Sequence, residues 1–373
     1  MIRWWRRFDW LLVGALIPLG AAGLVTMNSF TSESYFFERQ LIWLALGALV
    51  LTGASLIDWR FLRRSGIVLG LYGFGCAVLL LLGVVAPTIK GAQSWFNLGA
   101  IALQPADFVK LILILVLAKY FSRRHVEIAH VRHIIISGFY AVIPFLLILF
   151  QPDFGSAVII FLIWFGMIIF SGISKRHLFV VIGAGAAAFL VAWLFVFAPY
   201  QKARIVSFIH PLADIRGSGY NAFQSTVAVG SGQLVGKGVG YGTQSRLRFL
   251  PEYETDFIFA AFAEEWGLIG VVLFFALFGL VIWRIIKASM IAETNFEALF
   301  GIGLAIMLVG HFVINVGMNI GLLPVTGLTL PFVSYGGSHL VAEFLGLGIL
   351  LGMRRYARGF HRDDMKNEFL GVA

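Results

Sequence analysis

Residues 249–266 read FLPEYETDFIFAAFAEEW, and in this stretch acidic residues stand beside an apolar run. Asp256 stands directly before the apolar residues 257–262. A carboxylate beside apolar side chains is partly desolvated, which suits a proton acceptor near neutral pH. On composition alone, an acidic lip where a loop re-enters a membrane explains the stretch equally well. It holds five of the 19 Asp and Glu residues of the chain: Glu252, Glu254, Asp256, Glu264 and Glu265.

The composition around this stretch is that of a membrane protein. The 373 residues are 60% hydrophobic, with 36 Phe and 42 Gly, and apolar runs of about 18–20 residues recur along the chain. We therefore predict an all-α, polytopic membrane protein that forms a single integral-membrane domain over residues 1–373. Ten spans are expected, at 10–28, 40–57, 66–86, 105–121, 134–150, 155–172, 178–198, 265–286, 298–320 and 335–353.

Basic residues indicate which side of the membrane each loop faces. They precede the first span and cluster after spans two, four, six, eight and ten. The positive-inside rule places these loops and both termini in the cytoplasm. The net charge of +9 is explained by this orienting role, so no nucleic-acid partner is expected. The residues are Arg3, Arg6, Arg7; Arg60, Arg63, Arg64; Arg123, Arg124, Arg132; Lys175, Arg176; Arg284, Lys287; and Arg354, Arg355, Arg358.

The remaining loops then face the outside, and the largest is 199–264, between spans seven and eight. A loop of this length is usually functional or disordered, and this one is too apolar and too rich in Gly for a solvated linker. All of the shorter outer motifs share the predicted face of Asp256, which favours a functional site there over an acidic lip. These motifs are KGAQSWFNLG (90–99), QPADFVK (104–110), QPDFGS (151–156) and LPFVSYGGSH (330–339).

The Gly-rich segment GSGQLVGKGVGYG, residues 230–242, does not fit a phosphate-binding loop. Such a loop needs Gly where Ser231 stands, and Ser or Thr after its Lys, whereas Gly238 follows Lys237. We expect the glycines to let a tight loop pack on the membrane surface.

Polar residues also occur inside the predicted spans. His311, Asn315 and Asn319 recur every four residues and so share one helix face. For this stripe we favour an interhelical hydrogen-bond network over a functional role. Glu343 is harder to explain as structure, because a charged group inside a bilayer is costly, and His339, four residues earlier, is its only evident partner.

KGAQSW, QPDFG, the loop from GYNAFQS to GYGTQS, FLPEYETDFIFAAFAEEWG and PFVSYGGS follow one another in this order. Over nearly the whole chain they resemble the SEDS family (shape, elongation, division and sporulation). KGAQSW and GTQS are more similar to the elongation-type, rod-shape members than to the division-type members. The resemblance implies a peptidoglycan glycosyltransferase in the bacterial cytoplasmic membrane. It would polymerise lipid II, the undecaprenyl-diphosphate-linked disaccharide pentapeptide, during cell elongation and rod-shape maintenance.

The resemblance also implies roles for individual residues. Asp256 takes the place of the family's essential acid and would act as general base on the attacking sugar hydroxyl. Lys110 and Arg204 would neutralise the departing diphosphate, although Lys110 also fits a side chain that snorkels to the interface. The predicted substrate or diphosphate contacts are Lys110, Arg204, Gln224, Asp153, Asp107, Ser334 and Ser338.

Three positions depart from the family pattern. Ser94 stands where Arg is common, Asp107 where Glu is expected, and Glu254 where His is usual. The first removes a phosphate contact and the third makes the surroundings of Asp256 more negative, but the acid itself is retained. The resemblance requires no cofactor; it permits a magnesium or manganese ion held by Asp153, with or without Asp107.

Alternative functions and partners follow from the same residues. A lipid-II flippase or other transporter is the main alternative, although a carrier places its essential polar groups near the bilayer midplane; a division-type polymerase and an assembly scaffold are the others.

The outer segments hold no Ser-x-x-Lys motif of a transpeptidase. The resemblance therefore implies a class B penicillin-binding protein as partner, with further elongation-complex membrane proteins. We predict docking on spans eight and nine at Gly301, Gly303 and Gly310.

Overall fold

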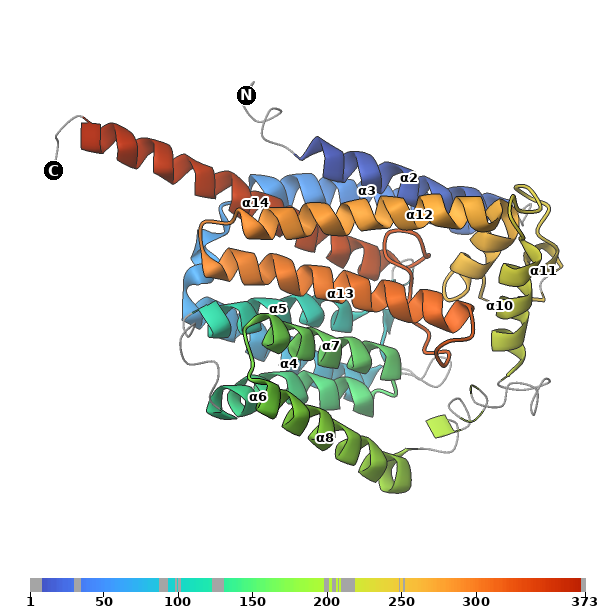
Figure 1. Cartoon of the computed structure of the whole chain (residues 1–373), viewed down its shortest axis with the longest axis horizontal. Coiled ribbons are helices and arrows are strands. Elements are labelled where there is room, and N and C mark those ends of the chain that lie inside the picture. The colour runs from blue at the N-terminus through green and yellow to red at the C-terminus, as the bar shows by residue number, and fades with distance from the viewer. Residues whose placement is uncertain are drawn as a thin grey trace.

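The described part of the chain is a bundle of long helices (Figure 1). The computed structural model describes residues 9–29, 35–86, 93–97, 99, 102–122, 131–197, 201–202, 206, 208, 219–247, 249–250 and 252–369. The long helices are α2 (Trp10–Asn28), α3 (Tyr35–Leu56), α4 (Ser65–Val85), α5 (Pro105–Ser122), α6 (Val131–Phe150), α7 (Phe154–Phe170), α8 (Lys175–Val191), α12 (Ile258–Met290), α13 (Asn295–Asn319) and α14 (Gly337–Phe369).

Shorter elements connect these helices. A 3₁₀ turn, η1 (Trp59–Arg63), links α3 to α4, and a π-helical turn, η2 (Ala192–Val196), extends α8. Two-residue strands β1 (Phe96–Asn97) and β2 (Ala102–Leu103) pair antiparallel, with Phe96 opposite Leu103. Helices α10 (Tyr220–Ser231) and α11 (Thr243–Arg246) lie at the right-hand end of the bundle in Figure 1.

Each of the ten predicted spans falls on one of the long helices, which confirms a mainly helical protein. Within the described residues, seven helices are long and apolar enough to cross a membrane. They are α2, α3, α4, α6, α8 with its extension to Phe195, α12 and α13, and α7 is a shorter apolar helix. The chain is thus a multi-pass membrane protein, and the count of ten spans stays a prediction.

Helix α13 occupies the middle of the bundle. It packs on α5, α7, α12 and α14, and Leu304 and Leu308 on it are fully buried. Helices α5, α7, α12 and α14 begin at the end of the bundle where α6 and α13 finish, beside α10 and α11 (Figure 1). We call this the loop end; it brings together the motifs that the sequence analysis assigned to the outer face.

Helix α12 begins at Ile258, earlier than the predicted start at 265, and is broken at Gly267, where φ is 64°. The Gly-rich segment inserts at this break. Lys237 and Gly238 donate backbone N–H groups to the carbonyls of Glu264 and Glu265, both at 3.0 Å. In return, Leu268 and Ile269 of α12 donate to the carbonyls of Gln233 and Leu234, at 2.9 and 3.1 Å. The loop therefore completes the hydrogen bonding of a broken helix.

The glycines of this segment are required by close backbone approach. A Cβ added at Gly236 would lie 2.0 Å from the carbonyl oxygen of Glu265, and one at Gly232 would lie 2.0 Å from that of Ala263. Neither position has room for a side chain. The prediction of a tightly packed loop is confirmed, but its packing partner is the α12 backbone, whereas we predicted the membrane surface.

The three glycines predicted as a docking face for a foreign helix are buried, and that prediction is wrong. A Cβ at Gly301 would meet Ser289 Oγ at 2.1 Å, and one at Gly303 would meet Ile114 at 2.6 Å. Gly310 faces Ile159 of α7. These small residues allow α13 to approach its own neighbours, α5, α7 and the end of α12.

Candidate functional site

The backbone of Asp256 is held by the polar stripe of α13. Its carbonyl accepts hydrogen bonds from Asn315 Nδ2 at 3.1 Å and Asn319 Nδ2 at 3.0 Å. The side chain of Asp256 is half-buried, and a Cβ on Gly327 would lie 3.6 Å from its Oδ2 atom. The interhelical network predicted for the stripe is confirmed, and it binds the backbone of Asp256.

Asn319 extends this network to α10 and α12. Its Oδ1 atom accepts from the backbone N–H of Ala260 at 3.1 Å, in the first turn of α12. It also lies 3.2 Å from Ser225 Oγ, which donates to the Asn319 carbonyl at 2.8 Å. Gln224, a predicted substrate contact, is the half-buried neighbour of Ser225 on α10. One amide therefore ties together α10, α12 and α13 beside Asp256.

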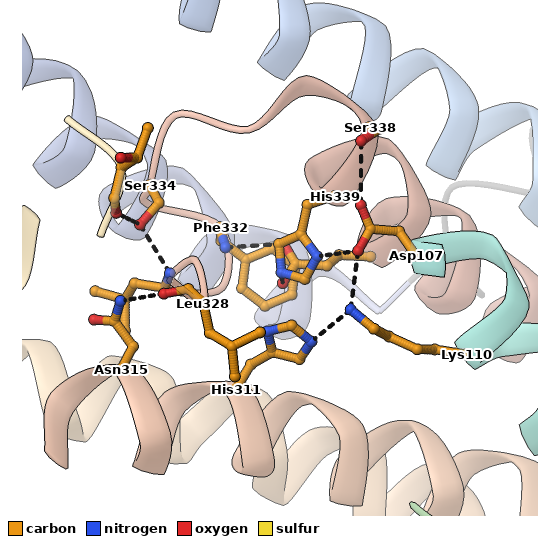
Figure 2. Close-up of polar contacts among 12 residues, drawn as sticks. Asp107, Lys110, His311, Asn315, Leu328, Phe332, Ser334, Ser338 and His339 are labelled. Atoms are coloured by element: carbon orange, nitrogen blue, oxygen red, sulfur yellow. Dashed lines mark hydrogen bonds and ion pairs between the residues drawn. The ribbon is translucent and has the colours of Figure 1, made fainter. Parts of the chain in front are cut away.

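The segment between α13 and α14 covers the same region, and we call residues 328–336 the crossover loop (Figure 2). Asn315 Nδ2 donates to the Leu328 carbonyl at 2.7 Å as well as to Asp256. Ser334 Oγ donates to the Thr255 carbonyl at 2.7 Å and accepts from the Leu330 N–H at 2.8 Å. Ser334, predicted to touch substrate, is thus buried and engaged in holding the segment before Asp256.

A cluster of buried charges lies where α5, α13 and α14 meet (Figure 2). Lys110 Nζ lies 3.0 Å from Asp107 Oδ1 and 3.3 Å from His311 Nε2. The Lys110 side chain is only 1% exposed, so the alternative that it snorkels to the interface is wrong. Its ammonium is paired inside the protein, as a buried charge must be.

The cluster continues along the first turns of α14. Asp107 Oδ1 lies 3.1 Å from His339 Nδ1, and Asp107 Oδ2 accepts from Ser338 Oγ at 3.1 Å. His339 Nε2 lies 2.9 Å from Glu343 Oε1, which confirms the predicted pairing of these two residues. The angle of this last contact falls outside hydrogen-bond geometry, so we treat it as an electrostatic contact. The second oxygen of Glu343 accepts the backbone N–H of Phe332 at 2.9 Å.

Asp153 caps the start of α7 and joins the same cluster through Gln104. Its Oδ1 atom accepts from the Ser156 N–H at 3.0 Å, and its Oδ2 atom accepts from Gln104 Nε2 at 2.8 Å. The Gln104 N–H in turn donates to Ser338 Oγ at 3.2 Å. Within the described residues no group of three or more His, Cys, Asp or Glu is arranged to hold a metal. The divalent cation at Asp153 stays a prediction.

The two glutamates that close the opening motif have a different role. Glu264 is fully buried, and it accepts from Lys237 Nζ at 2.7 Å and from the N–H groups of Thr243 and Gln244 at 2.9 and 3.1 Å. Glu265 accepts from the Gly240 N–H at 2.6 Å. Both carboxylates anchor the Gly-rich segment to α12. For these two buried acids, the interpretation as the acidic lip of a loop that re-enters the membrane is wrong.

The predicted residues thus form two groups joined by α13 and the crossover loop. Asp107, Lys110, Asp153 and Ser338 belong to the charge cluster, whereas Asp256 and Ser334 belong to the second group. Arg204 lies outside the residues that the structure describes. No role was predicted for Gln104 or Phe332. Gln104 could have been found, because it is the first residue of the QPADFVK motif. Nothing in the sequence near Phe332 indicated that its backbone belongs to the site.

The fold and the site define a multi-pass helical membrane protein in which buried charged residues pair with one another towards one end of the bundle. The family model described as cell cycle protein, which covers FtsW, RodA and SpoVE, matches residues 4–359. The chain belongs to this family, the SEDS family.

Individual relatives agree with this assignment. The probable peptidoglycan glycosyltransferase FtsW of Thiomicrospira cyclica is 36% identical over 352 residues, which cover 91% of this chain and 88% of the relative. The peptidoglycan glycosyltransferase MrdB of Escherichia coli K12 is 34% identical, with 93% of each chain covered. A solved chain matches with a TM-score of 0.80 and 32% identity, covering 94% of this chain and 98% of its own length. It belongs to a structure described as "Structural coordination of polymerization and crosslinking by a peptidoglycan synthase complex".

Proposed function

We propose that this chain polymerises lipid II into glycan strands at the outer face of the cytoplasmic membrane, during cell elongation and rod-shape maintenance. The chain is a peptidoglycan glycosyltransferase of the SEDS family, the activity named for both relatives. The observation that carries the proposal is the double clamp of Asn315 and Asn319 on the Asp256 backbone at the loop end. A backbone fixed in this way gives the carboxylate a defined point of attachment, which suits a positioned general base.

The proposed reaction transfers a glycan from one lipid-linked diphosphate to another. The attacking sugar hydroxyl forms a bond from its oxygen to the anomeric carbon of the donor, while the bond from that carbon to the diphosphate oxygen breaks. The hydroxyl proton passes to the Asp256 carboxylate. The departing diphosphate keeps the electron pair of the broken bond, and nearby positive charge stabilises it.

Lys110 and Arg204 are the proposed sources of that positive charge. Because Lys110 is bound by Asp107 and His311, direct contact with a diphosphate requires it to exchange these partners. While the pairs are intact, Lys110 acts through its field at the start of α5, partly offset by Asp107. A magnesium or manganese ion would be held by Asp153, whose carboxylate already accepts hydrogen bonds from Gln104 and from the Ser156 N–H. The roles proposed for Lys110 and Arg204 do not depend on such an ion.

The assignment to elongation rests on the KGAQSW and GTQS motifs, because relatives of both the FtsW and the MrdB type match at similar identity. The proposed partners are the lipid-II substrate, a class B penicillin-binding protein transpeptidase and other membrane proteins of the elongation complex. The solved relative that takes part in coordinated polymerisation and crosslinking supports such a partner. The alternative of a lipid-II transporter is less well supported, because Asp107, Ser338 and His339 lie in the first turns of their helices, whereas in the same cluster only His311 lies well inside its helix.

The test is a gel assay of glycan polymerisation from purified lipid II. Asp256→Asn removes the proton acceptor but leaves the backbone carbonyl that Asn315 and Asn319 bind, so folding should be retained. A positioned base contributes about 10²–10⁴ to a rate, and we expect the variant to lose at least about a hundredfold. Glycan synthesis by Asp256→Asn at the rate of the wild type would refute the proposal.

A further inference from the structure

Phe332 in the crossover loop has a backbone conformation that an aromatic residue rarely adopts. Its φ is +65°, in the left-handed region that favours glycine, and its side chain is 1% exposed. A bulky residue stays in this region only when its surroundings hold it there. The strain at Phe332 therefore points to a specific group that fixes its backbone.

Glu343 is that group. Its Oε2 atom accepts the Phe332 N–H at 2.9 Å, and the Glu343 side chain is fully buried. Its other oxygen faces His339, which also contacts Asp107 of the charge cluster. Both oxygens of the Glu343 carboxyl group thus have a polar contact inside the bundle, as a buried polar group requires.

The loop held by Glu343 shares a hydrogen-bond donor with the Asp256 segment before Phe332 and contacts that segment directly after Phe332. Four residues earlier, the Leu328 carbonyl shares Asn315 Nδ2 with the Asp256 carbonyl. Two residues later, Ser334 Oγ donates to the Thr255 carbonyl at 2.7 Å. The Tyr335 N–H donates to the Glu254 carbonyl at 2.8 Å. The loop around Phe332 therefore binds the carbonyls of residues 254 and 255, and it shares the Asn315 amide with the carbonyl of residue 256.

We infer that Glu343 is a positioning residue, which holds the crossover loop through the Phe332 N–H and thereby sets the position of residues 254–256. The inference rests on the proposed function, because it is the position of Asp256 that gives Glu343 its importance. Glu343 does not touch the reacting groups; it acts through Phe332 and the loop.

Two substitutions separate the effect of the hydrogen bond from Phe332 N–H to Glu343 from the effect of the Glu343 charge. Glu343→Gln keeps an oxygen that can accept the Phe332 N–H, and its amide can face His339. Glu343→Leu removes the acceptor and leaves a buried N–H unpaired. Leu347→Ala is the matched control, because Leu347 is also fully buried, one turn further along α14, and its truncation weakens packing without removing a hydrogen bond to the loop.

The first readout needs no catalysis. Thr255→Cys in a Cys76→Ser background places a single thiol in the segment, and its alkylation rate reports how firmly the segment is held. Glu343→Leu should raise this rate by at least about fivefold, the factor that one unpaired buried donor implies. Glu343→Gln and Leu347→Ala should stay within about twofold. Glu343→Met, unbranched and of similar length, replaces the Leu variant if that does not insert stably.

The second readout is lipid-II polymerisation by the otherwise natural chain, corrected for folded protein. Glu343→Leu should lower kcat by at least about tenfold with KM within about threefold, and Glu343→Gln should remain near the wild type. The inference is overturned if the Leu variant matches the Leu347→Ala control, or if Gln raises thiol reactivity as much as Leu. Full activity of Asp256→Asn would instead overturn the proposed function, and the thiol readout would still decide the inference.

Discussion

Removing the two amides that clamp Asp256 tests whether they act as alternative donors to one carbonyl. Asn315→Leu removes donors to the carbonyls of Asp256 and Leu328, and Asn319 still serves Asp256. Bonds between membrane helices average about 0.6 kcal/mol, whereas an unpaired buried carbonyl costs about 1–3 kcal/mol. Since Leu328 alone loses its amide partner, we expect the free energy of unfolding to fall by about 1–3 kcal/mol.

Asn319→Leu should destabilise the protein more than Asn315→Leu. Asn319 donates to the carbonyls of Asp256 and Asn315 and accepts from the Ala260 N–H and Ser225 Oγ. All of these contacts are lost in the variant, and we expect the free energy of unfolding to fall by about 2–4 kcal/mol. The double variant leaves the Asp256 carbonyl without either amide, so the loss should exceed the sum of the single losses by about 0.5–1 kcal/mol or more.

The assay is a double-mutant cycle on unfolding in detergent, with lipid-II polymerisation measured on the same samples. Each single variant should keep a measurable rate, because one amide still binds the Asp256 carbonyl, and the double variant should lose nearly all of it. Additive effects on stability, or single variants as inactive as the double, would refute the idea that the amides substitute for one another.

Three further predictions concern charge and orientation. Lys110→Met should lower stability by about 3–5 kcal/mol by leaving Asp107 buried without its ammonium; Lys110→Met with Asp107→Asn should recover stability but not polymerisation. Burial opposes ionisation of Asp9, yet hydrogen bonds from Arg284 and from the Leu12 N–H hold its pKa below the usual 3.8. The stability that Asp9 contributes is therefore complete above about pH 5 and is lost as pH falls through the lowered pKa, so acid melts of Asp9→Asn should lack this loss. In a Cys76→Ser background, cysteines at 231 and 254 should react with impermeant reagents in spheroplasts, and those at 176 and 287 only after permeabilisation; the reverse pattern would move the site to the cytoplasm.

The helices could be predicted from the sequence because their signal is local. Apolar runs and flanking charges locate them, and a four-residue spacing is sufficient to place His311, Asn315 and Asn319 on one face. The pairing of His339 with Glu343 followed from the same spacing. Helix packing was less predictable, since a glycine such as Gly303 looks the same in sequence whether it faces lipid or a neighbouring helix.

The break at Gly267 and the conformation of Phe332 could not be predicted from local sequence. The break is stabilised by residues 233–238, about thirty positions earlier, and no local pattern shows that this segment supplies the missing hydrogen bonds. A left-handed φ would be expected at a glycine such as Gly336 or Gly337, but Phe332 adopts it instead. The Phe332 N–H is bound there by Glu343, eleven residues later in the chain. In both places a distant partner overrides the local preference.

The site fixes Asp256 through the backbone, and this separates position from chemistry. The carbonyls of residues 254, 255 and 256 are bound by Tyr335, Ser334 and the two asparagines. These contacts do not depend on which side chain stands at 256. A substitution there changes the proton acceptor while its support remains, whereas substitutions in the crossover loop or on α13 move the acceptor without changing it. Loss of activity with retained segment rigidity therefore identifies chemistry, and loss of both identifies positioning.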